Sequence, residues 1–454
     1  MSYPARHRVL TRTHHRDLRY DLSARRSVPE VGGKLYAGGI TVSYGTKAPA
    51  LKTAPRASFT QDSPGVPGTA EEFDSFGSSA TSGDLDGDGY ADLVVGSYGE
   101  DAGAIDNAGS LTVLWGGRDG LSGGAVIKGT KRDQFLGMNA VAGDYDGDGH
   151  HDLATESHVH HGPFTRNGDA ARTAAVPLAA RDAQDGDWTE FRLAAGDPNG
   201  DGISDLVVAA ELEGDGDEVP SLPPLIQYAA GSRDGLTAAV TLDDTPVRGG
   251  WDLALGDLND DGYDEIVVGH VSTSEAYRKG GVLGVLSGSA TGPDTRSWRT
   301  IDQNTSGVPG SAEAGDEFGS SIAVGDADGD GYTDLAVRAP GEDVGAKRNA
   351  GSVLLLRGSG NGLLTAGSRL FTQDTPGIPG TVENGTSTRG DWFGKAVKLV
   401  DATRDGRAEL VIGTPGENDR GGGVWVLRGA VDGTTGTGSF AFGLGAGLGG
   451  SFNR

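Results

Sequence analysis

The sequence contains no cysteine among its 454 residues, which excludes disulfide bonds and cysteine-ligated zinc. It has no long apolar run, so it predicts no transmembrane helix. Basic residues are scarce, with 38 Lys and Arg against 64 Asp and Glu, and the net charge is −26. This balance argues against a nucleic-acid partner, because no basic stripe is present to neutralise phosphates.

Hydrophobic residues are also few, at 36% of the chain, whereas glycine is abundant, with 79 residues. That composition does not suit helix bundles and indicates a protein made of short strands and turns. The sequence therefore predicts an all-β fold.

One acidic motif organises the chain: Asp84-Leu85-Asp86-Gly87-Asp88-Gly89-Tyr90-Ala91-Asp92, followed by the apolar run 93–95. Carboxylates stand at its first, third, fifth and ninth positions, and a glycine stands at the sixth. A hard cation such as Ca²⁺ takes about six to eight oxygen ligands. Carboxylates held this close would otherwise repel and raise one another's pKa. The motif therefore predicts a calcium loop.

The motif recurs five more times. The later copies begin at Asp144, Asp197, Asp257, Asp326 and Asp401, and successive first residues are 60, 53, 60, 69 and 75 apart. A period of this size indicates an array of supersecondary units, as in a solenoid or propeller.

An EF-hand is excluded, because it needs a bidentate Glu at the twelfth position and flanking helices. The twelfth residues here are Val95, Thr155, Val208, Val268, Val337 and Ile412. The ninth residue is therefore expected to complete the coordination, helped by the backbone carbonyl of the seventh. The predicted ligands are Asp84, Asp86, Asp88, Tyr90 and Asp92; Asp144, Asp146, Asp148, His150 and Asp152; Asp197, Asn199, Asp201, Ile203 and Asp205; Asp257, Asn259, Asp261, Tyr263 and Glu265; Asp326, Asp328, Asp330, Tyr332 and Asp334; and Asp401, Asp405 and Glu409.

Each complete unit has the same layout. An aromatic opener precedes a small-residue strand, the acidic loop, a buried apolar strand, a Gly/Pro/Ser turn, an alternating strand and a weaker fourth strand. Four short strands with tight turns are typical of a propeller blade. The openers place complete blades near residues 76, 135, 191, 251, 318 and 393.

The first unit lacks its front half. Gly38-Gly-Ile-Thr-Val-Ser-Tyr-Gly45 matches the later Gly109-Ser-Leu-Thr-Val-Leu-Trp-Gly116, but no acidic loop precedes it. We therefore expect a propeller over 32–445 with an incomplete first blade at 32–75, which is either seven-bladed or a ring of six and a half blades. Residues 1–31 are expected to be disordered or a misassigned start, with no signal peptide visible, and residues 446–454 to form a tail.

These motifs resemble the FG-GAP repeats of the integrin alpha-chain propeller and its secreted bacterial relatives, over roughly residues 33–445. The resemblance implies a seven-bladed ring with Ca²⁺ loops on one face. We expect about five occupied sites. The sixth loop has Thr403 in place of a carboxylate and contains Arg404 and Arg407, so an arginine could replace the cation there.

Two further features allow alternatives. A transition metal could be held by five histidines in one blade, although loop histidines without a function are commoner: His150, His151, His158, His160 and His161.

The tripeptide that integrins recognise occurs at Arg389-Gly390-Asp391. Its Gly-Asp belongs to the repeat frame shared with Gly315-Asp316.

The sequence thus favours a calcium-binding, non-catalytic scaffold for binding or adhesion. We expect an extracellular or cell-envelope location in a bacterium, an unknown protein or carbohydrate ligand, and a monomer. The alternative is a secreted hydrolase or lyase acting on phospholipid or polysaccharide. Its site would lie on the loop face near the second complete blade, which opens near residue 135.

Overall fold

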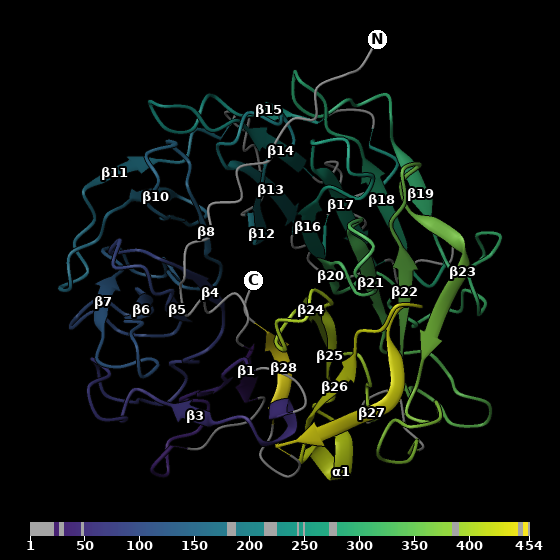
Figure 1. The fold of residues 1–454 in the computed structure, drawn as a ribbon. Coiled ribbons are helices and arrows are strands. Elements are labelled where there is room, and N and C mark those ends of the chain that lie inside the picture. Colours follow the sequence, from purple (N-terminus) through teal and green to yellow (C-terminus); the bar gives the residue numbers. More distant parts are fainter. Residues whose placement is uncertain are drawn as a thin grey trace.

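The computed structural model describes residues 22–26, 31–46, 50–178, 188–212, 225–242, 245–247, 250–271, 279–383, 390–443 and 448–452. These residues form seven antiparallel sheets of four strands each, arranged as blades around a common centre (Figure 1). The predicted seven-bladed propeller is therefore confirmed.

The four strands of each blade follow one another from the centre of the ring outward. Blade 1 contains β28 (Leu448–Phe452), β1 (Leu22–Arg26), β2 (Ile40–Ser43) and β3 (Arg56–Phe59). Blade 2 contains β4 (Ala80–Gly83), β5 (Asp92–Ser97), β6 (Ser110–Leu114) and β7 (Ala125–Lys128). Blade 3 contains β8 (Val141–Gly143), β9 (Asp152–Ala154), β10 (His158–His161) and β11 (Arg172–Ala175). Blade 4 contains β12 (Trp188–Gly196), β13 (Asp205–Leu212), β14 (Leu225–Ala229) and β15 (Val240–Thr241).

The remaining blades repeat the same order. Blade 5 contains β16 (Asp252–Gly256), β17 (Glu265–His270), β18 (Val282–Leu286) and β19 (Arg299–Ile301). Blade 6 contains β20 (Ile322–Gly325), β21 (Asp334–Ala339), β22 (Ser352–Arg357) and β23 (Leu364–Phe371). Blade 7 contains β24 (Ala396–Val400), β25 (Glu409–Gly413), β26 (Val424–Arg428) and β27 (Thr435–Phe442). The 3-10 turn η2 (Ala50–Thr53) and the helix α1 (Glu417–Arg420) are the helical elements of the described segments, and neither could cross a bilayer.

The hydrophobic core lies between neighbouring blades. One cluster joins Ile40 and Val42 of blade 1 to Phe76 and Leu93 of blade 2, and the other blade pairs have equivalent clusters. The opener Phe76 is fully buried, and Gly38 of the preceding blade lies so close that an added Cβ would be 2.2 Å from the Phe76 amide nitrogen. The opener side chains therefore pack between adjacent sheets and hold them in contact.

The openers differ between units. In blade 3 the buried opener is Leu136, 3% exposed, rather than the expected Phe135, which is half-buried with a positive φ of 52°. Trp251 of blade 5 is 38% exposed. The opener position needs an apolar side chain of suitable shape, and Leu136 shows that it need not be aromatic.

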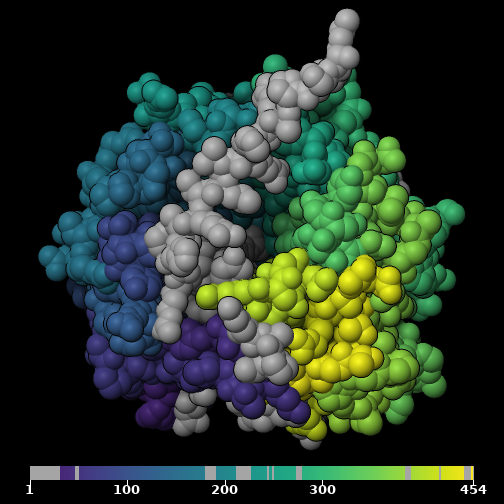
Figure 2. Space-filling view, in the orientation of Figure 1, coloured from purple at the N-terminus to yellow at the C-terminus, as the bar shows by residue number. Residues whose placement is uncertain are grey.

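The expectation of an incomplete first blade is wrong. Strand β28 pairs antiparallel with β1, so the C-terminal strand completes the sheet that begins near the N-terminus. In Figures 1 and 2 the yellow end of the chain lies against the purple first blade. Two segments expected outside the propeller, 1–31 and 446–454, thus supply strands β1 and β28. Since β28 and β1 come from opposite ends of the chain, no acidic loop joins the two inner strands of blade 1.

Closure by β28 generates a prediction about stability. A chain ending at residue 447 leaves the inner edge of β1 unpaired and removes Phe452 from the cluster formed with Val400 and Val411. We expect its melting temperature to fall by about 5 °C or more and its tendency to associate through the open edge to rise. A chain ending at residue 452 is the control, and equal melting of the two chains would contradict closure by β28.

Candidate metal centres

The six acidic loops occupy equivalent places in blades 2 to 7, each joining the innermost strand to the second strand. We name each loop by its first residue: the Asp84, Asp144, Asp197, Asp257, Asp326 and Asp401 loops. In the Asp84 loop the strands it joins pair Gly83 with Asp92, so the loop closes directly on the sheet. The regular strand register therefore positions every loop in the same way.

The turn itself is built the same way in all six loops. The amide of the sixth-position glycine donates a hydrogen bond to the first-position carboxylate, at 2.8–2.9 Å. These glycines, from Gly89 to Gly406, have φ values between 85° and 94°, a conformation that favours glycine. The first aspartate thus shapes the loop as well as carrying a candidate ligand.

The ninth-position carboxylate ties its loop to the sheet. Asp92 Oδ2 accepts from the Leu85 amide at 2.9 Å, and Oδ1 accepts from the Gly116 amide, after β6, at 2.7 Å. Asp334 accepts two equivalent bonds, each of 2.9 Å. Both oxygens of these predicted ligands therefore already serve as backbone acceptors, and metal ligation would use their remaining lone pairs.

The Asp197 loop departs from this pattern because its second residue is Pro198, which has no amide proton. Here the Tyr228 hydroxyl of β14 donates to Asp205 Oδ2 at 2.7 Å instead. A side chain from the third strand thus replaces the missing backbone donor.

Burial makes these carboxylates costly to ionise. Desolvation raises the pKa of Asp92, Asp205 and Asp334 to about 7, although backbone hydrogen bonds oppose the shift. It also raises the pKa of Glu265 and Glu409 to about 7. Neighbouring loop carboxylates add to each of these shifts. At neutral pH each loop therefore gains from a positive charge placed among its oxygens.

Three loops bring enough carboxylates together to hold a cation. Candidate ligand oxygens lie within 4.8 Å of one another in three sets: Asp84, Asp86 and Asp92; Asp144, Asp146 and Asp148; and Asp326, Asp328 and Asp334. Asp84 Oδ1 and Asp146 Oδ1 are buried and have no hydrogen-bond partner among the described residues. A buried acceptor without a donor is unfavourable, and hard oxygen donors of this kind suit Ca²⁺. The residues present thus fit a calcium ion.

The other three loops have a neutral third residue. Asn259 Nδ2 donates to Glu265 Oε1 at 2.9 Å, Asn199 Nδ2 to Asp205 Oδ1 at 3.3 Å, and Thr403 Oγ1 to Glu409 Oε1 at 3.2 Å. These bonds satisfy the ninth-position carboxylate from within the loop. Fewer charged ligands also weaken calcium affinity, so the structure separates three charge-rich loops from three that are partly neutral.

Arginines contact each of the three charge-rich loops. Arg166, from the β10–β11 connection of blade 3, places Nε 2.6 Å from Asp86 Oδ2 and Nη2 2.6 Å from Asp88 Oδ2. Arg172 Nη2 lies 2.9 Å from Asp146 Oδ2, and Arg357 of β22 pairs with Asp328. All three side chains are partly exposed. They can therefore move into solvent when another cation competes.

In the Asp401 loop, where an arginine was expected to replace the cation, Arg407 makes a different contact. Its Nε donates to the backbone carbonyl of Asp328 in the preceding Asp326 loop, at 3.3 Å. Arginine–carboxylate pairs occur instead in the Asp84, Asp144 and Asp326 loops, which contain more carboxylates. More negative charge per loop attracts a side-chain cation more strongly.

The five histidines expected as one group have separate environments. His161 is buried, with Nδ1 3.0 Å from Asp152 Oδ2 and 3.1 Å from Asp146 Oδ2, so it belongs to the Asp144 loop. On β10, His158 contacts Ser157, just before the strand, and His160 contacts Thr173 of β11. His150 and His151 pack on the Asp84 loop of the neighbouring blade.

Four of the loops also contact the preceding loop through a backbone bond. The eighth-position amide donates to the first-position carbonyl of the preceding loop: His151 to Asp84 at 3.3 Å, Ser204 to Asp144 at 2.8 Å, Asp264 to Asp197 at 3.1 Å and Ala408 to Asp326 at 2.7 Å. The seventh-position side chain covers a glycine of that loop. An added Cβ at Gly200 would lie 2.7 Å from the Tyr263 ring, and one at Gly147 3.0 Å from Ile203.

We call this set of backbone bonds between loops the loop belt. The sequence predicts Tyr90, His150, Ile203, Tyr263 and Tyr332 as ligands through their carbonyl oxygens alone. The structure shows that His150, Ile203 and Tyr263 also pack across the blade boundary. Sequence reasoning missed this role, and it missed Arg166, Arg172, Arg357 and Tyr228 as loop partners.

The arginine contacts predict competition with calcium. In Arg166→Gln a positive charge is removed from Asp86 and Asp88 while hydrogen-bonding capacity is kept. We expect Ca²⁺ affinity at the Asp84 loop to rise by roughly three- to tenfold. Isothermal titration calorimetry against Arg132→Gln, an exposed arginine paired with Asp106 outside the loops, measures the difference. Unchanged or weaker binding by Arg166→Gln would show that the arginine supports the loop instead of competing.

Comparison with known proteins agrees with the repeat pattern. The FG-GAP repeat family matches residues 76–114 and 318–356, which contain the Asp84 and Asp326 loops. The Drosophila melanogaster integrin alpha-PS2 is 30% identical over 230 residues, covering 46% of this chain and 16% of that protein. The Rattus norvegicus phosphatidylinositol-glycan-specific phospholipase D is 32% identical over 180 residues, covering 39% of this chain and 20% of that enzyme.

The matches thus span only a fifth or less of these relatives' lengths. Among solved structures, the NanB sialidase of Streptococcus pneumoniae aligns over 81% of this chain and 61% of its own, with 12% identity and a TM-score of 0.36. So weak a likeness carries no weight beside the repeats, the integrin matches and the seven sheets. The chain thus contains FG-GAP repeats and is similar to integrin alpha chains over less than half of its length.

Proposed function

We propose that this protein is a calcium-stabilised, non-catalytic scaffold for binding or adhesion outside the cell or in its envelope. The observation that carries the proposal is the buried, unpartnered Asp84 Oδ1 within a loop of converging carboxylates. The equivalent atom of the Asp144 loop is Asp144 Oδ1, which accepts from Asp148, but Asp146 Oδ1 there is likewise buried and unpartnered. Buried acceptors of this kind call for a cation rather than for another hydrogen-bond donor.

The ligands proposed are the carboxylate and amide oxygens at the first, third, fifth and ninth positions, with the seventh-position carbonyl. The Asp84, Asp144 and Asp326 loops have the charge to hold calcium most strongly, followed by the Asp197 and Asp257 loops. The Asp401 loop is expected to bind weakly because Thr403 replaces a carboxylate. Bound calcium adds positive charge among these carboxylates, beyond that of the arginines beside three of the loops, and joins the two ends of each loop.

The proposed binding role rests on the loops that connect the strands of the blades. The blades keep a fixed core, whereas the connections between strands differ in length and sequence from blade to blade. Such loops on a rigid frame are where recognition residues usually lie. We propose a protein or carbohydrate partner and a monomeric propeller. Resemblance to integrin alpha chains supports adhesion.

Adhesion through the Arg389-Gly390-Asp391 tripeptide is disfavoured by the position of its aspartate. Asp391 is 1% exposed, and its Oδ2 accepts from the Glu383 amide at 2.6 Å. Arg389 lies outside the described residues. An aspartate that is buried and bonded in this way cannot be presented to a partner.

A secreted hydrolase or lyase is the second candidate, supported by the matches to phospholipase D relatives. Its expected site is the blade that contains the histidines. There, His161 is buried between two loop aspartates, and burial lowers the pKa of His160 to about 4. The roles of these two histidines are therefore better explained by packing and loop support than by proton transfer near neutral pH.

Calcium dependence and pH dependence together test the scaffold. The folded-state pKa of Asp92, Asp205 and Asp334 is about 7, above the ordinary carboxyl value. Between roughly pH 4 and pH 7 the folded protein keeps protons that the unfolded chain has lost, so stability falls as pH rises through that window. We expect the melting temperature in EDTA to fall from pH 5 to pH 8, and millimolar Ca²⁺ to abolish most of that fall.

Two variants make the test specific. Asp84→Asn should lose part of the calcium stabilisation, which is about 2.7 kcal/mol at a hundredfold excess over Kd, yet melt like the wild type in EDTA. Asp119→Asn, an exposed residue in a hairpin outside the loops, should behave as the wild type in both conditions. A melting temperature that does not change on addition of Ca²⁺ at any pH would exclude a calcium-stabilised scaffold.

A further inference from the structure

The described residues include seven large hydrophobic side chains that are exposed, and three of them lie together where blade 1 meets blade 2. Leu35 is 50% exposed, Tyr36 51% and Phe73 58%. The Tyr36 and Phe73 rings stack on each other, with centroids 5.5 Å apart and 19° between their planes. The Phe73 amide donates to the Leu35 carbonyl at 3.0 Å, so all three are neighbours. We call these three side chains the aromatic patch.

The same pair of turns occurs where blade 2 meets blade 3, with polar residues in place of the patch. There the Asp133 amide donates to the Asp106 carbonyl at 3.1 Å, and the next residue of that turn, Asn107, accepts from Phe135 at 3.1 Å. In the first pair of turns, Tyr36 accepts from Ser75 at 2.9 Å in the same way. The places of Leu35, Tyr36 and Phe73 are thus taken by Asp106, Asn107 and Asp133.

The polar version of these turns is fully bonded. Asn107 Nδ2 donates to Asp133 Oδ1 at 2.9 Å, where the first pair of turns has stacked rings. Arg132 Nη2 lies 2.5 Å from Asp106 Oδ2, and Glu72 holds the place of Arg132 beside the patch. Polar side chains therefore suffice to build this blade boundary, and the aromatic rings are not needed for it.

The backbone makes aromatic residues a poor choice at these two places. Tyr36 has a φ of 56° and Phe73 a φ of 72°, and the corresponding Asn107 and Asp133 have values of 48° and 52°. The turn thus imposes a left-handed conformation, which asparagine and aspartate tolerate better than bulky residues do. Residues held in such conformations cluster at functional sites. A contiguous exposed apolar patch also indicates a binding surface, whereas single exposed hydrophobics do not.

The patch is too small for a folded partner. Side chains of this size have about 200 Å² each, so half-exposed they present roughly 300 Å² together. A stable protein interface buries about 800 Å² on each partner, which excludes a second copy of the chain as a stable occupant. An extended peptide is disfavoured as well, because the amides of Phe73 and Ser75 already bond to the carbonyls of Leu35 and Tyr36 and cannot pair with another strand.

The rim of the patch is acidic. Glu71 and Glu72 directly precede Phe73, and both are exposed. Position 72 borders position 35, since the corresponding Arg132 and Asp106 are in contact. Carboxylates accept hydrogen bonds from hydroxyl groups and repel other anions. The whole chain, with a net charge of −26, disfavours an anionic ligand in the same sense.

We propose that the aromatic patch binds one neutral hexopyranose unit of a polysaccharide. The C–H face of such a ring is apolar and covers an aromatic side chain. The hydroxyl groups at the edge of the ring donate to Glu71 and Glu72. This inference rests on the proposed binding role and names the class of its partner.

The test is isothermal titration calorimetry of the full calcium-loaded chain. The probes are cellohexaose, maltohexaose, mannohexaose and galactohexaose, with hexagalacturonate as the anionic counterpart of galactohexaose. We expect at least one neutral hexasaccharide to bind with one site per chain, and hexagalacturonate to bind at least tenfold more weakly than that sugar. Absence of binding by all four neutral sugars, or equally tight binding of hexagalacturonate, would overturn the proposal.

The double variant Tyr36→Asn/Phe73→Asp reproduces the polar pair of the next blade boundary. It should bind the sugar at least tenfold more weakly, yet melt at or above the wild-type temperature, because both new residues suit the left-handed backbone. Val431→Asn, at an exposed hydrophobic residue between β26 and β27, is the control and should bind as the wild type. Full affinity in a folded double variant would contradict a site at the patch.

Sedimentation velocity of the free wild-type chain and the double variant tests the remaining occupant. We expect monomers of both, and a wild-type dimer that the double variant does not form would identify a second copy on the patch and overturn the proposal. Melting with and without Ca²⁺ tests the scaffold separately. Failure of sugar binding with calcium stabilisation intact would therefore reject this inference alone.

Discussion

The structure depends on one electrostatic constraint, the confinement of several carboxylates within each nine-residue loop. The sixth-position glycine and the ninth-position carboxylate fix the backbone, so the loop cannot relax its charges apart. Burial raises the pKa of Asp92 and Asp334 to about 7, because their ionised forms are unfavourable there. Any cation that reaches these oxygens stabilises the folded chain, whether it is a metal ion or an arginine.

The loop belt extends this constraint along two runs of neighbouring blades, from blade 2 to blade 5 and from blade 6 to blade 7. A loop that opens loses its own turn and also the amide bond to its neighbour, for example the bond from Ser204 to Asp144 at 2.8 Å. Blades of a propeller share cores only with adjacent blades, so contacts between neighbouring loops add coupling where the sheets themselves have little. Calcium in one loop is therefore expected to support the next blade as well as its own.

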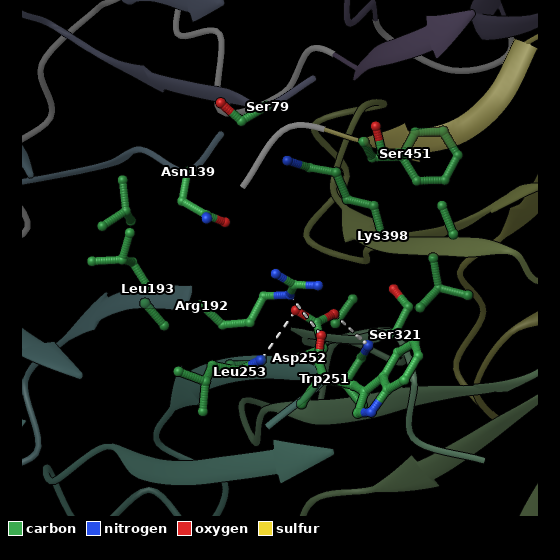
Figure 3. Close-up of a pocket in the computed structure, with 18 of the residues that line it drawn as sticks. Ser79, Asn139, Arg192, Leu193, Trp251, Asp252, Leu253, Ser321, Lys398 and Ser451 are labelled. Carbon is green, nitrogen blue, oxygen red and sulfur yellow. Dashed lines mark hydrogen bonds between the residues drawn. The ribbon is translucent and has the colours of Figure 1, made fainter. Parts of the chain in front are cut away.

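The acidic loops and the basic side chains that line the central cavity (Figure 3) place charges of opposite sign in different parts of the molecule. The acidic loops carry the carboxylates that recur at fixed positions, and these attract cations. The cavity collects Arg192, Arg338, Lys395 and Lys398 within walls of small side chains. A ring stabilised from its loops can leave its centre open, because the innermost strands do not have to fill it with large apolar residues.

The repeated loops and the seven blades could be predicted because they are local: Asp84 to Asp92 and the apolar run after it lie within a dozen residues. Ring closure could not, because the pairing of β28 with β1 joins opposite ends of the chain and neither segment carries the repeat. Arg166 was missed for a similar reason. Arg166 reaches the Asp84 loop from the next blade, 78 residues away. Arg357, by contrast, directly precedes Gly358, whose amide binds Asp334, so its place beside the Asp326 loop could have been inferred from the sequence.

Amide hydrogen exchange at the loop belt tests the central claim most directly. The relevant amides are those of His151, Ser204, Asp264 and Ala408, each of which bonds to the preceding loop. If calcium holds the loops as a connected belt, chelation should increase exchange at all four amides together, while the buried strand β5 keeps its protection. Exchange that is unchanged by chelation, or that increases at one loop without its neighbours, would contradict the account.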